Sequence, residues 1–443
     1  MNPIGSSFAI VSVALLASMS RAHAVTLEQV LQTTLEKNPT IQQAKAGVEE
    51  AAGRRLVLRS IMWPDVRIGI PAGVQGGERA GESKTKVFGF VRGWLTQPLF
   101  NAAIPPSNRR GEVNILIAEQ QLNVTVMEQL HAARVAFYTA LFNRELESIR
   151  REQQQRLGQN AASQKDRYQA GLTDRSAFTG ATVEARALDE EVENARRAYA
   201  QARLTLAEAM AREVRTRPTL PLPDPEGELR TTPFRVDLES EMGRALIQRA
   251  DLKLARLLVR AANEDQRIIE ADYYPLISGR ISGDYIPVSG IHREGSSRRT
   301  DDFISSEIRE GAAFTWRVID NGKVTGAVMK QSAARDINQL TCQKLETNVR
   351  AELARIYNEL KAIDARQESL STGSNAAQES VELVTQNLAN GVASQLEHRM
   401  SQNGLLETRS GLLEVAYQRS VAMAEWDRAT GRYFQFSDDR KVP

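Results

Sequence analysis

Two long stretches of the chain carry apolar residues at steps of three and four positions, the spacing of an amphipathic helix. Residues 107–217 and 288–442 contain no proline. The segment from about Asn108 to Gln169, taken as a single helix at about 1.5 Å per residue, would be on the order of 90 Å long. A helix of that length cannot bury itself within a globule, so the pattern predicts helices that pack along one another as antiparallel coiled-coil hairpins.

Four shorter segments change to a period of two, the pattern of a β-strand with one apolar face. The alternation is strict in 277–285, occurs again in 65–70 and 309–318, and is noisier in 85–99. A strand of about 9 to 11 residues is long enough to cross a bilayer at a tilt. Two polar segments between the paired strands are predicted to be loops outside the cell: 73–86 and 290–302.

Four strands are too few to close a membrane barrel, and an open sheet edge in lipid would leave backbone groups unpaired. Several protomers must therefore contribute strands. Three protomers give twelve strands, whereas two give eight, and an eight-stranded barrel is filled by its own side chains. The count favours a trimer over a dimer. Four charged residues are predicted to face the lumen, either for wetting alone or for selectivity: Arg280, Asp284, Arg309 and Arg317.

The chain contains two copies of one unit. Apolar positions in 35–64 match those in 246–275, and YQAGL at 168–172 matches LANGV at 388–392. Each copy is predicted to hold a helix, two strands, a long helix, a turn and a return helix. The predicted boundaries are a first copy at 25–217, a Pro-rich linker at 218–240, a second copy at 241–432 and a C-terminal tail at 433–443.

Residues 1–24 have the pattern of a signal peptide. The apolar run Phe8–Ala17 is too short to cross a bilayer as a helix, and Ala22-His23-Ala24 is a small-x-small cleavage site. No later run approaches the roughly 20 apolar residues of a membrane helix, so any membrane crossing would use strands.

Charge and candidate chemistry narrow the function. A formal net charge of +2 over 443 residues argues against a nucleic-acid partner. One cysteine and four histidines provide no disulfide framework, metal cluster or cofactor site, and no nucleophile or nucleotide-binding motif occurs, so no enzyme is predicted. His398 is interpreted as a surface residue rather than a metal ligand, and Cys342 as a packed small side chain.

Six segments together resemble the TolC-like outer membrane efflux proteins, or outer membrane factors, over nearly the whole chain after the signal segment. They are VTLEQVLQTTLEKNPTIQQAK at 25–45, WLTQPLFN at 94–101, RYQAGLTDRSAF at 167–178, RADLKLARLLVRAA at 249–262, DYYPLISGRIS at 272–282 and NLANGVASQLEH at 387–398. The resemblance implies a mainly α fold with a membrane β-barrel. Long antiparallel α-hairpins would form a trimeric α-barrel in the periplasm, and four strands per protomer would enter a shared 12-stranded β-barrel in the outer membrane.

The resemblance also implies partners and no cofactor. The implied partners are two further copies in a homotrimer, a periplasmic adaptor (membrane fusion) protein, an inner-membrane pump of the RND or ABC type that supplies energy, and outer membrane lipid. Small-molecule efflux and type I protein secretion use the same passive conduit, so both remain open. A secreted periplasmic coiled-coil tether without channel activity would explain the long helices and the export signal. It would not explain four alternating strands at matched places in a duplication.

The two hairpin tips acquire roles through the resemblance. In the family, glycine-centred tips form the closed periplasmic entrance, and their grooves receive the adaptor. The alternative is that each glycine only permits a positive φ at a helix end. The matching residues are Gly171, Leu172 and Thr173 in the first tip and Gly391, Val392 and Ala393 in the second.

Two carboxylates about one helical turn apart line the entrance of relatives. Glu397 matches the first position and Met400 the second, so half of that filter is absent, and Glu397 is alternatively a solvated surface charge. Some relatives also lock the closed tip with a tyrosine, an arginine and an aspartate. Leu388, Ala393 and Ala177 occupy those positions, so closure is expected to depend on packing or on groups such as Asp174 and Arg175.

Overall fold

The computed structural model describes residues 24–79, 82–211, 222–229, 234–288 and 303–435. The chain divides into two compact units. The hairpin unit comprises Met1–Gln42, Val126–Gly243 and Ala351–Phe434, and the sheet unit comprises Gln43–Thr125, Arg244–Arg350 and Gln435–Pro443. The signal peptide up to residue 23, parts of the Pro-rich linker and the loop predicted at 290–302 lie outside the described residues.

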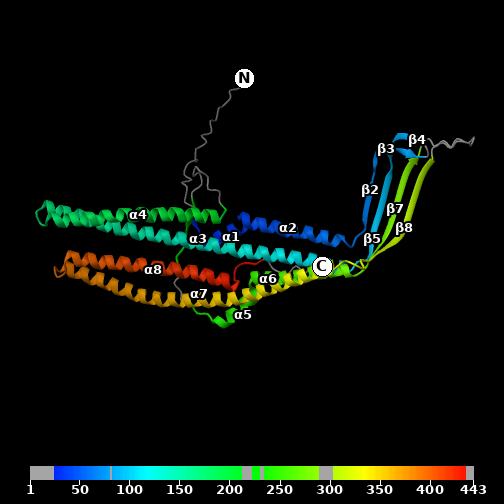
Figure 1. Ribbon diagram of the computed structural model, residues 1–443. Helices are drawn as coiled ribbons and strands as arrows, with labels where there is room; N and C mark the ends of the chain where they lie inside the picture. Colours follow the sequence, from blue (N-terminus) through cyan, green and yellow to red (C-terminus); the bar gives the residue numbers. More distant parts are fainter. Residues whose placement is uncertain (1–23, 80–81, 212–221, 230–233, 289–302, 436–443) are drawn as a thin grey trace, which may run out of the picture. The chain divides into compact units, whose positions relative to one another are not determined.

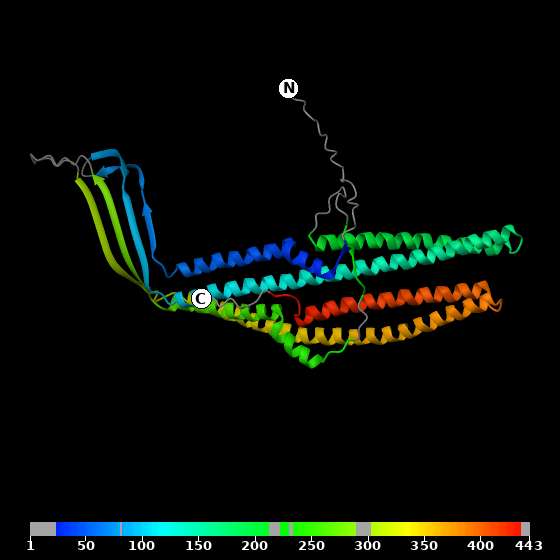
Figure 2. The same cartoon turned by 180° about the vertical axis from the view of Figure 1, so that it is seen from behind.

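Four long helices form two antiparallel hairpins (Figures 1 and 2). The first pairs α3, Ile104–Gln169, with α4, Arg175–Ala209, and the second pairs α7, Lys323–Ala389, with α8, Gln395–Thr430. The predicted helical hairpins are therefore confirmed, and α3 ends at the predicted residue. No helix in the described part of the chain combines the length and the hydropathy that spanning a bilayer requires.

Polar and aromatic contacts connect the helices of the hairpin unit. The Phe142 and Tyr417 rings stack between α3 and α8 with centroids 4.7 Å apart. The Arg134 guanidinium on α3 lies 2.6 Å from the Asp427 carboxylate on α8. Within the second hairpin, Arg419 of α8 pairs with Asp364 of α7. The first two contacts join the two hairpins, and the third joins the two helices of the second hairpin.

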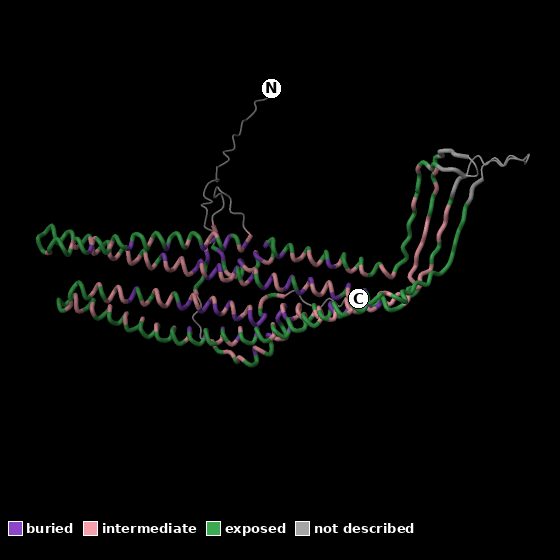
Figure 3. Tube along the Cα trace, in the orientation of Figure 1, coloured by how far each residue is buried: buried purple, intermediate pink, exposed green. Residues whose placement is uncertain are grey.

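The core of the hairpin unit lies where α3, α4 and α8 meet the short α1, Leu27–Lys37. Leu141, Leu206 and Ala424 are fully buried there. Figure 3 shows that buried positions become sparse toward the hairpin tips, where most residues are exposed. A two-residue parallel pairing of β1, Ala24–Val25, with β6, Asp224–Pro225, borders this core.

Ion pairs hold the helices of the sheet unit together. On α3, Arg109 lies 2.9 Å from Glu264 and Arg110 lies 2.7 Å from Asp265 of α6. The bounds of the shorter helices are α2 Pro39–Ser60, α5 Leu238–Gln248, α6 Ala250–Glu270 and the 3₁₀ turn η1 Ala271–Tyr273.

Four antiparallel strands form one sheet in the order β2-β5-β7-β8. Their bounds are β2 Asp65–Gly69, β5 Val91–Phe100, β7 Leu276–Val288 and β8 Phe303–Thr315. The central β5–β7 pair joins the first copy of the repeat to the second. Among the described strands, β2 and β8 each pair on one side only, so the sheet has two open edges.

The segment predicted as the first external loop instead forms a β-hairpin. β3, Ala72–Arg79, pairs with β4, Glu82–Gly89, in a two-stranded sheet of its own. The single strand predicted at 85–99 was therefore wrong, because the chain divides it into β4 and β5 at Phe90. Phe90 donates its N–H to the Pro71 carbonyl across the ribbon (3.1 Å), and Pro71 has no N–H to return.

The last strand also differs from the prediction of 309–318, since β8 begins earlier and ends at Thr315. The ladder with β7 ends at Thr315, and the indole N–H of the next residue, Trp316, bonds to the Tyr273 carbonyl (3.1 Å). Asp320 then accepts the backbone N–H groups of Val324 and Gly322 at the start of α7, and these bonds lower the pKa of its carboxyl. Residues 316–322 therefore form a strand-to-helix connection.

Candidate functional site

The strand register places polar side chains together on one face of the four-stranded sheet. Residues paired directly across antiparallel strands lie on the same face. Arg92 pairs with Asp284, Trp94 with Ser282, and Ser282 in turn with Arg309. Apolar residues occupy the other face: Val66, Ile68, Leu95, Ile281, Ile308 and Phe314. One polar face and one apolar face are expected of a wall between water and lipid.

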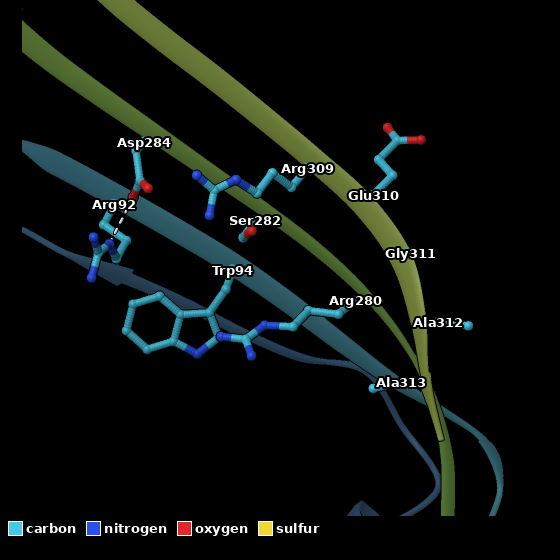
Figure 4. Close-up of a pocket in the computed structure, with 10 residues that line it drawn as sticks. All are labelled: Arg92, Trp94, Arg280, Ser282, Asp284, Arg309, Glu310, Gly311, Ala312 and Ala313. Atoms are coloured by element: carbon cyan, nitrogen blue, oxygen red, sulfur yellow. Dashed lines mark hydrogen bonds and ion pairs between the residues drawn. The ribbon is translucent and has the colours of Figure 1, made fainter. Parts of the chain in front are cut away.

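Most charges on the polar face are paired. Arg92 Nε lies 2.6 Å from Asp284 Oδ1, and Arg309 Nη2 lies 2.7 Å from Glu307 Oε2. Arg280 has no ion-pair partner among the described residues. With Arg92, Trp94, Ser282, Asp284 and Arg309, it lines a shallow hollow of about 490 Å³ (Figure 4).

Three of the four predicted lumen residues thus share this face, namely Arg280, Asp284 and Arg309. Arg317 does not, because it follows the end of β8 in the strand-to-helix connection. The apolar face carries one charge that the sequence pattern did not single out. Glu310 pairs with Ile281 on that face and is also among the residues that line the hollow.

Both hairpin tips have the same backbone geometry. The φ angle is +74° at Gly171 and +72° at Gly391. The Leu172 N–H bonds to the Arg167 carbonyl and the Gly171 N–H to the Tyr168 carbonyl, the two bonds of a Schellman motif. In the second tip, the Val392 N–H bonds to the Asn387 carbonyl and the Gly391 N–H to the Leu388 carbonyl. Each glycine therefore has a positive φ at the end of a helix, which is the structural role considered as the alternative to adaptor docking.

The tips also present apolar side chains to solvent. In a Schellman motif the residue after the glycine commonly packs back on its own helix. Here Leu172 is 70% exposed and Val392 is 77% exposed. Thr173 and Ala393, the next residues, are half-buried. The tips thus carry exposed apolar residues at matching positions.

The candidate entrance residues begin the return helices. Ser394 and Glu397 form a capping box at the start of α8, and Asp174 caps α4 by accepting the Ala177 N–H (2.8 Å). Met400 is 65% exposed one turn beyond Glu397. Asp174 and Glu397 therefore each have a local structural role in addition to any role at an entrance.

A charged contact between the hairpins lies near these tips. Arg399 Nη1 on α8 is 3.8 Å from Glu184 Oε2 on α4. Sequence reasoning missed this pair, because neither residue matches a lock position of the family and their contact depends on how two distant helices pack.

Comparisons with known proteins identify the family of the chain. The sequence model described as outer membrane efflux protein matches residues 30–212 and 242–432. The chain belongs to the outer membrane efflux protein family. The two matched ranges agree with the internal duplication. No curated protein matches the sequence.

Solved outer membrane channels have the same fold as this outer membrane efflux protein. The Campylobacter jejuni CmeC outer membrane channel is 13% identical with a TM-score of 0.77, covering 99% of this chain and 95% of that one. The outer membrane protein VceC from Vibrio cholerae is 15% identical with a TM-score of 0.74, covering 91% and 96%. CusC is 15% identical with a TM-score of 0.74, covering 94% and 95%.

Membership in this family locates the protein in the outer membrane and makes it part of an efflux channel family, whose members are transport conduits rather than enzymes. In the described part of this outer membrane efflux protein, no group of three or more His, Cys, Asp or Glu side chains could hold a metal ion. His398 instead bonds Thr385 (3.0 Å) and Gln402 (3.2 Å) through its Nε2 atom.

Proposed function

We propose that three copies of this chain form a passive channel through the outer membrane, the exit conduit of a tripartite efflux or type I secretion system. The observation that carries the proposal is the four-stranded sheet, which has a polar face, an apolar face and two open edges. Open edges in lipid would leave N–H and C=O groups unpaired, each at a cost of several kcal/mol. Pairing β8 of one copy with β2 of the next removes every edge.

Three copies satisfy this requirement while leaving a lumen. They pool twelve strands, and Arg280, Asp284 and Arg309 of each copy then face the water inside. The apolar face, with Val66, Ile281 and other aliphatic side chains, faces lipid.

The hairpin tips are the proposed docking surface for a periplasmic adaptor. Leu172 and Val392 extend from matching Schellman turns and are largely exposed, and an apolar side chain exposed at a helix tip suits burial by another helical hairpin. The sequence has no nucleotide-binding loop, so the energy would come from an inner-membrane pump of the RND or ABC type. Glu397, Met400 and Asp174 are the proposed entrance residues.

Planar-bilayer recording tests the proposal. Protein purified from outer membranes should insert and give stepwise currents of uniform size. Loss of transport in cells lacking the chain, restored by the parent gene, would connect these currents with efflux or secretion. Protein that never conducts and fractionates with the soluble periplasm would support a coiled-coil tether instead.

A further inference from the structure

The polar face of the sheet holds one large aromatic side chain among its charges. Trp94 of β5 pairs with Ser282 of β7 on one side and with Arg67 of β2 on the other. Wetting of a lumen requires no indole, and an aromatic side chain of a membrane strand is more usual on the lipid side, near an interface. Its position therefore needs a separate explanation.

The Trp94 ring lies over Gly69 of the neighbouring strand β2. A Cβ atom at Gly69 would be 3.8 Å from Trp94 Cζ3 and 3.9 Å from Cη2, so the six-membered ring occupies the space above this glycine. Figure 4 shows the indole extended across the strands, with its pyrrole side toward β7. The ring lies against β2 and also lines the hollow, so it forms an aromatic platform there.

Arg280 supplies a cation beside this platform. Its side chain extends toward the pyrrole side of Trp94 in Figure 4, and both residues line the hollow. The neighbouring cations are neutralised, since Arg92 is paired with Asp284 and Arg309 with Glu307. Arg280 is thus the hollow's arginine that remains available to an incoming anion.

Two further aromatic residues precede Trp94 in the chain, Phe88 at the end of β4 and Phe90 between β4 and β5. Their ring centroids are 6.1 Å apart, and the Arg92 guanidinium lies 5.3 Å from the Phe90 ring centroid. Phe88 lies over Gly73, where a Cβ would approach its ring within 3.2 Å. Phe88 over Gly73 therefore resembles Trp94 over Gly69, because each ring lies across a glycine of the strand that pairs with its own.

We propose that the hollow is a weak binding site for planar aromatic carboxylates, whose ring stacks on Trp94 while the carboxylate pairs with Arg280. Aromatic stacking and a guanidinium–carboxylate pair are complementary to this ligand class, and neither a neutral aromatic nor an aliphatic anion uses both groups. The inference rests on the proposed channel function, because the hollow would then face the lumen in three copies. A conduit must release what it binds, so binding is expected to be weak and rapidly reversible.

The test uses purified trimers and three probes. The probes are 2-naphthoate, cyclohexanecarboxylate, which lacks the aromatic ring, and 2-naphthalenemethanol, which lacks the charge. Current block is recorded in planar bilayers with each probe on the barrel side. Binding to the same detergent-solubilised protein is measured by saturation-transfer NMR, which does not depend on conduction.

The variants separate the two contacts. Trp94→Ala and Arg280→Gln should each raise the concentration of 2-naphthoate for half-maximal block and binding by roughly fivefold, the usual size of one stacking or one exposed ionic contact. Trp316→Ala and Arg317→Gln are matched controls, because both residues lie beyond the end of β8. The controls should behave like the parent.

Two results would overturn the site. One is 2-naphthoate binding that neither Trp94→Ala nor Arg280→Gln changes. The other is cyclohexanecarboxylate or 2-naphthalenemethanol binding as tightly as 2-naphthoate. Stepwise currents in the parent together with either result would reject the site and leave the channel function standing. Absence of any current would reject the channel itself, and the NMR titration would still decide whether the hollow binds the probe.

Discussion

Ser394 and Glu397 bond to each other reciprocally at the first turn of α8. The Glu397 N–H donates to Ser394 Oγ (3.2 Å), and Glu397 Oε2 accepts the Ser394 N–H (2.8 Å). The carboxylate that resembles the entrance filter of relatives is therefore also part of a helix cap. Glutamine completes a capping box as well as glutamate does, so charge and cap can be separated by substitution.

Glu397→Gln should retain the cap and remove the charge. If three copies of Glu397 ring the entrance, their field concentrates cations, so this variant should shift the reversal potential toward weaker cation preference. Met400→Asp should strengthen block by divalent cations, because it adds the second carboxylate. Ser394→Ala is the control: it should destabilise the start of α8 by about 0.5–2 kcal/mol without changing selectivity. If Glu397→Gln and Met400→Asp both conduct like the parent, Glu397 is not at the constriction.

Valine at Gly171 or Gly391 should impair docking and transport while trimers still form. A Cβ at either glycine would meet nothing within 4 Å, so the effect would come from the backbone alone. A left-handed φ costs an ordinary residue roughly 1–2 kcal/mol and a β-branched residue more. Asparagine, which tolerates this region, is the matched control and should largely preserve adaptor capture in a pull-down. Full transport in both valine variants would leave the tips without a docking role.

The main helices, the hairpin tips and the strand β7 could be predicted, because the sequence pattern in each of these segments agrees with the structure that forms there. Proline-free amphipathic stretches predicted α3, and the repeated glycines predicted both tips. Alternation in 277–285 placed Arg280 and Asp284 on one face of β7, as the register confirms. Each of these signals can be found in the order of residues along the chain, without knowledge of how the elements pack.

The remaining features depend on contacts between elements. The β3–β4 ribbon is rich in glycine, with an exposed Val74 paired with Val87, so its segment has the composition of a loop. The indole of Trp94 lies over Gly69 of another strand, a contact that the spacing within one strand does not indicate. The Arg399–Glu184 contact joins helices from the two copies of the repeat, and no sequence spacing indicates it.

Removing the Arg399–Glu184 contact should favour an open entrance. The pair is partly exposed and its atoms are 3.8 Å apart, so its contribution is expected to be below about 1 kcal/mol. Glu184→Gln should then raise the open fraction of single channels by at most roughly fivefold, since RT is about 0.6 kcal/mol. Glu190→Gln is the control, because it removes one negative charge from the same helix without touching the Arg399–Glu184 pair. Equal open fractions in the two variants would mean that the pair does not hold the entrance.

The hairpin unit should lose stability as the pH falls through the titration of His131. Burial and, secondarily, the Arg428 charge lower the pKa of His131 below its ordinary value of 6.5. Above pH 6.5, His131 is neutral in both the folded and the unfolded state, and the folded state has its full stability. As the pH falls from 6.5 through the lower folded pKa, the unfolded state binds a proton more readily, so the free energy of unfolding decreases. In melts followed by helical circular dichroism, His131→Gln should show a smaller decrease in Tm from pH 7.5 to 5 than the parent. Parallel curves would contradict the assignment.

Native mass spectrometry of protein extracted from outer membranes tests the central claim most directly. A sheet with open edges at β2 and β8 is stable in lipid only when other copies complete it, and twelve strands require three. The account predicts one dominant species at three times the mass of the mature chain, which separates into single chains on heating in detergent. A monomer, recovered folded and free of membrane, would contradict it.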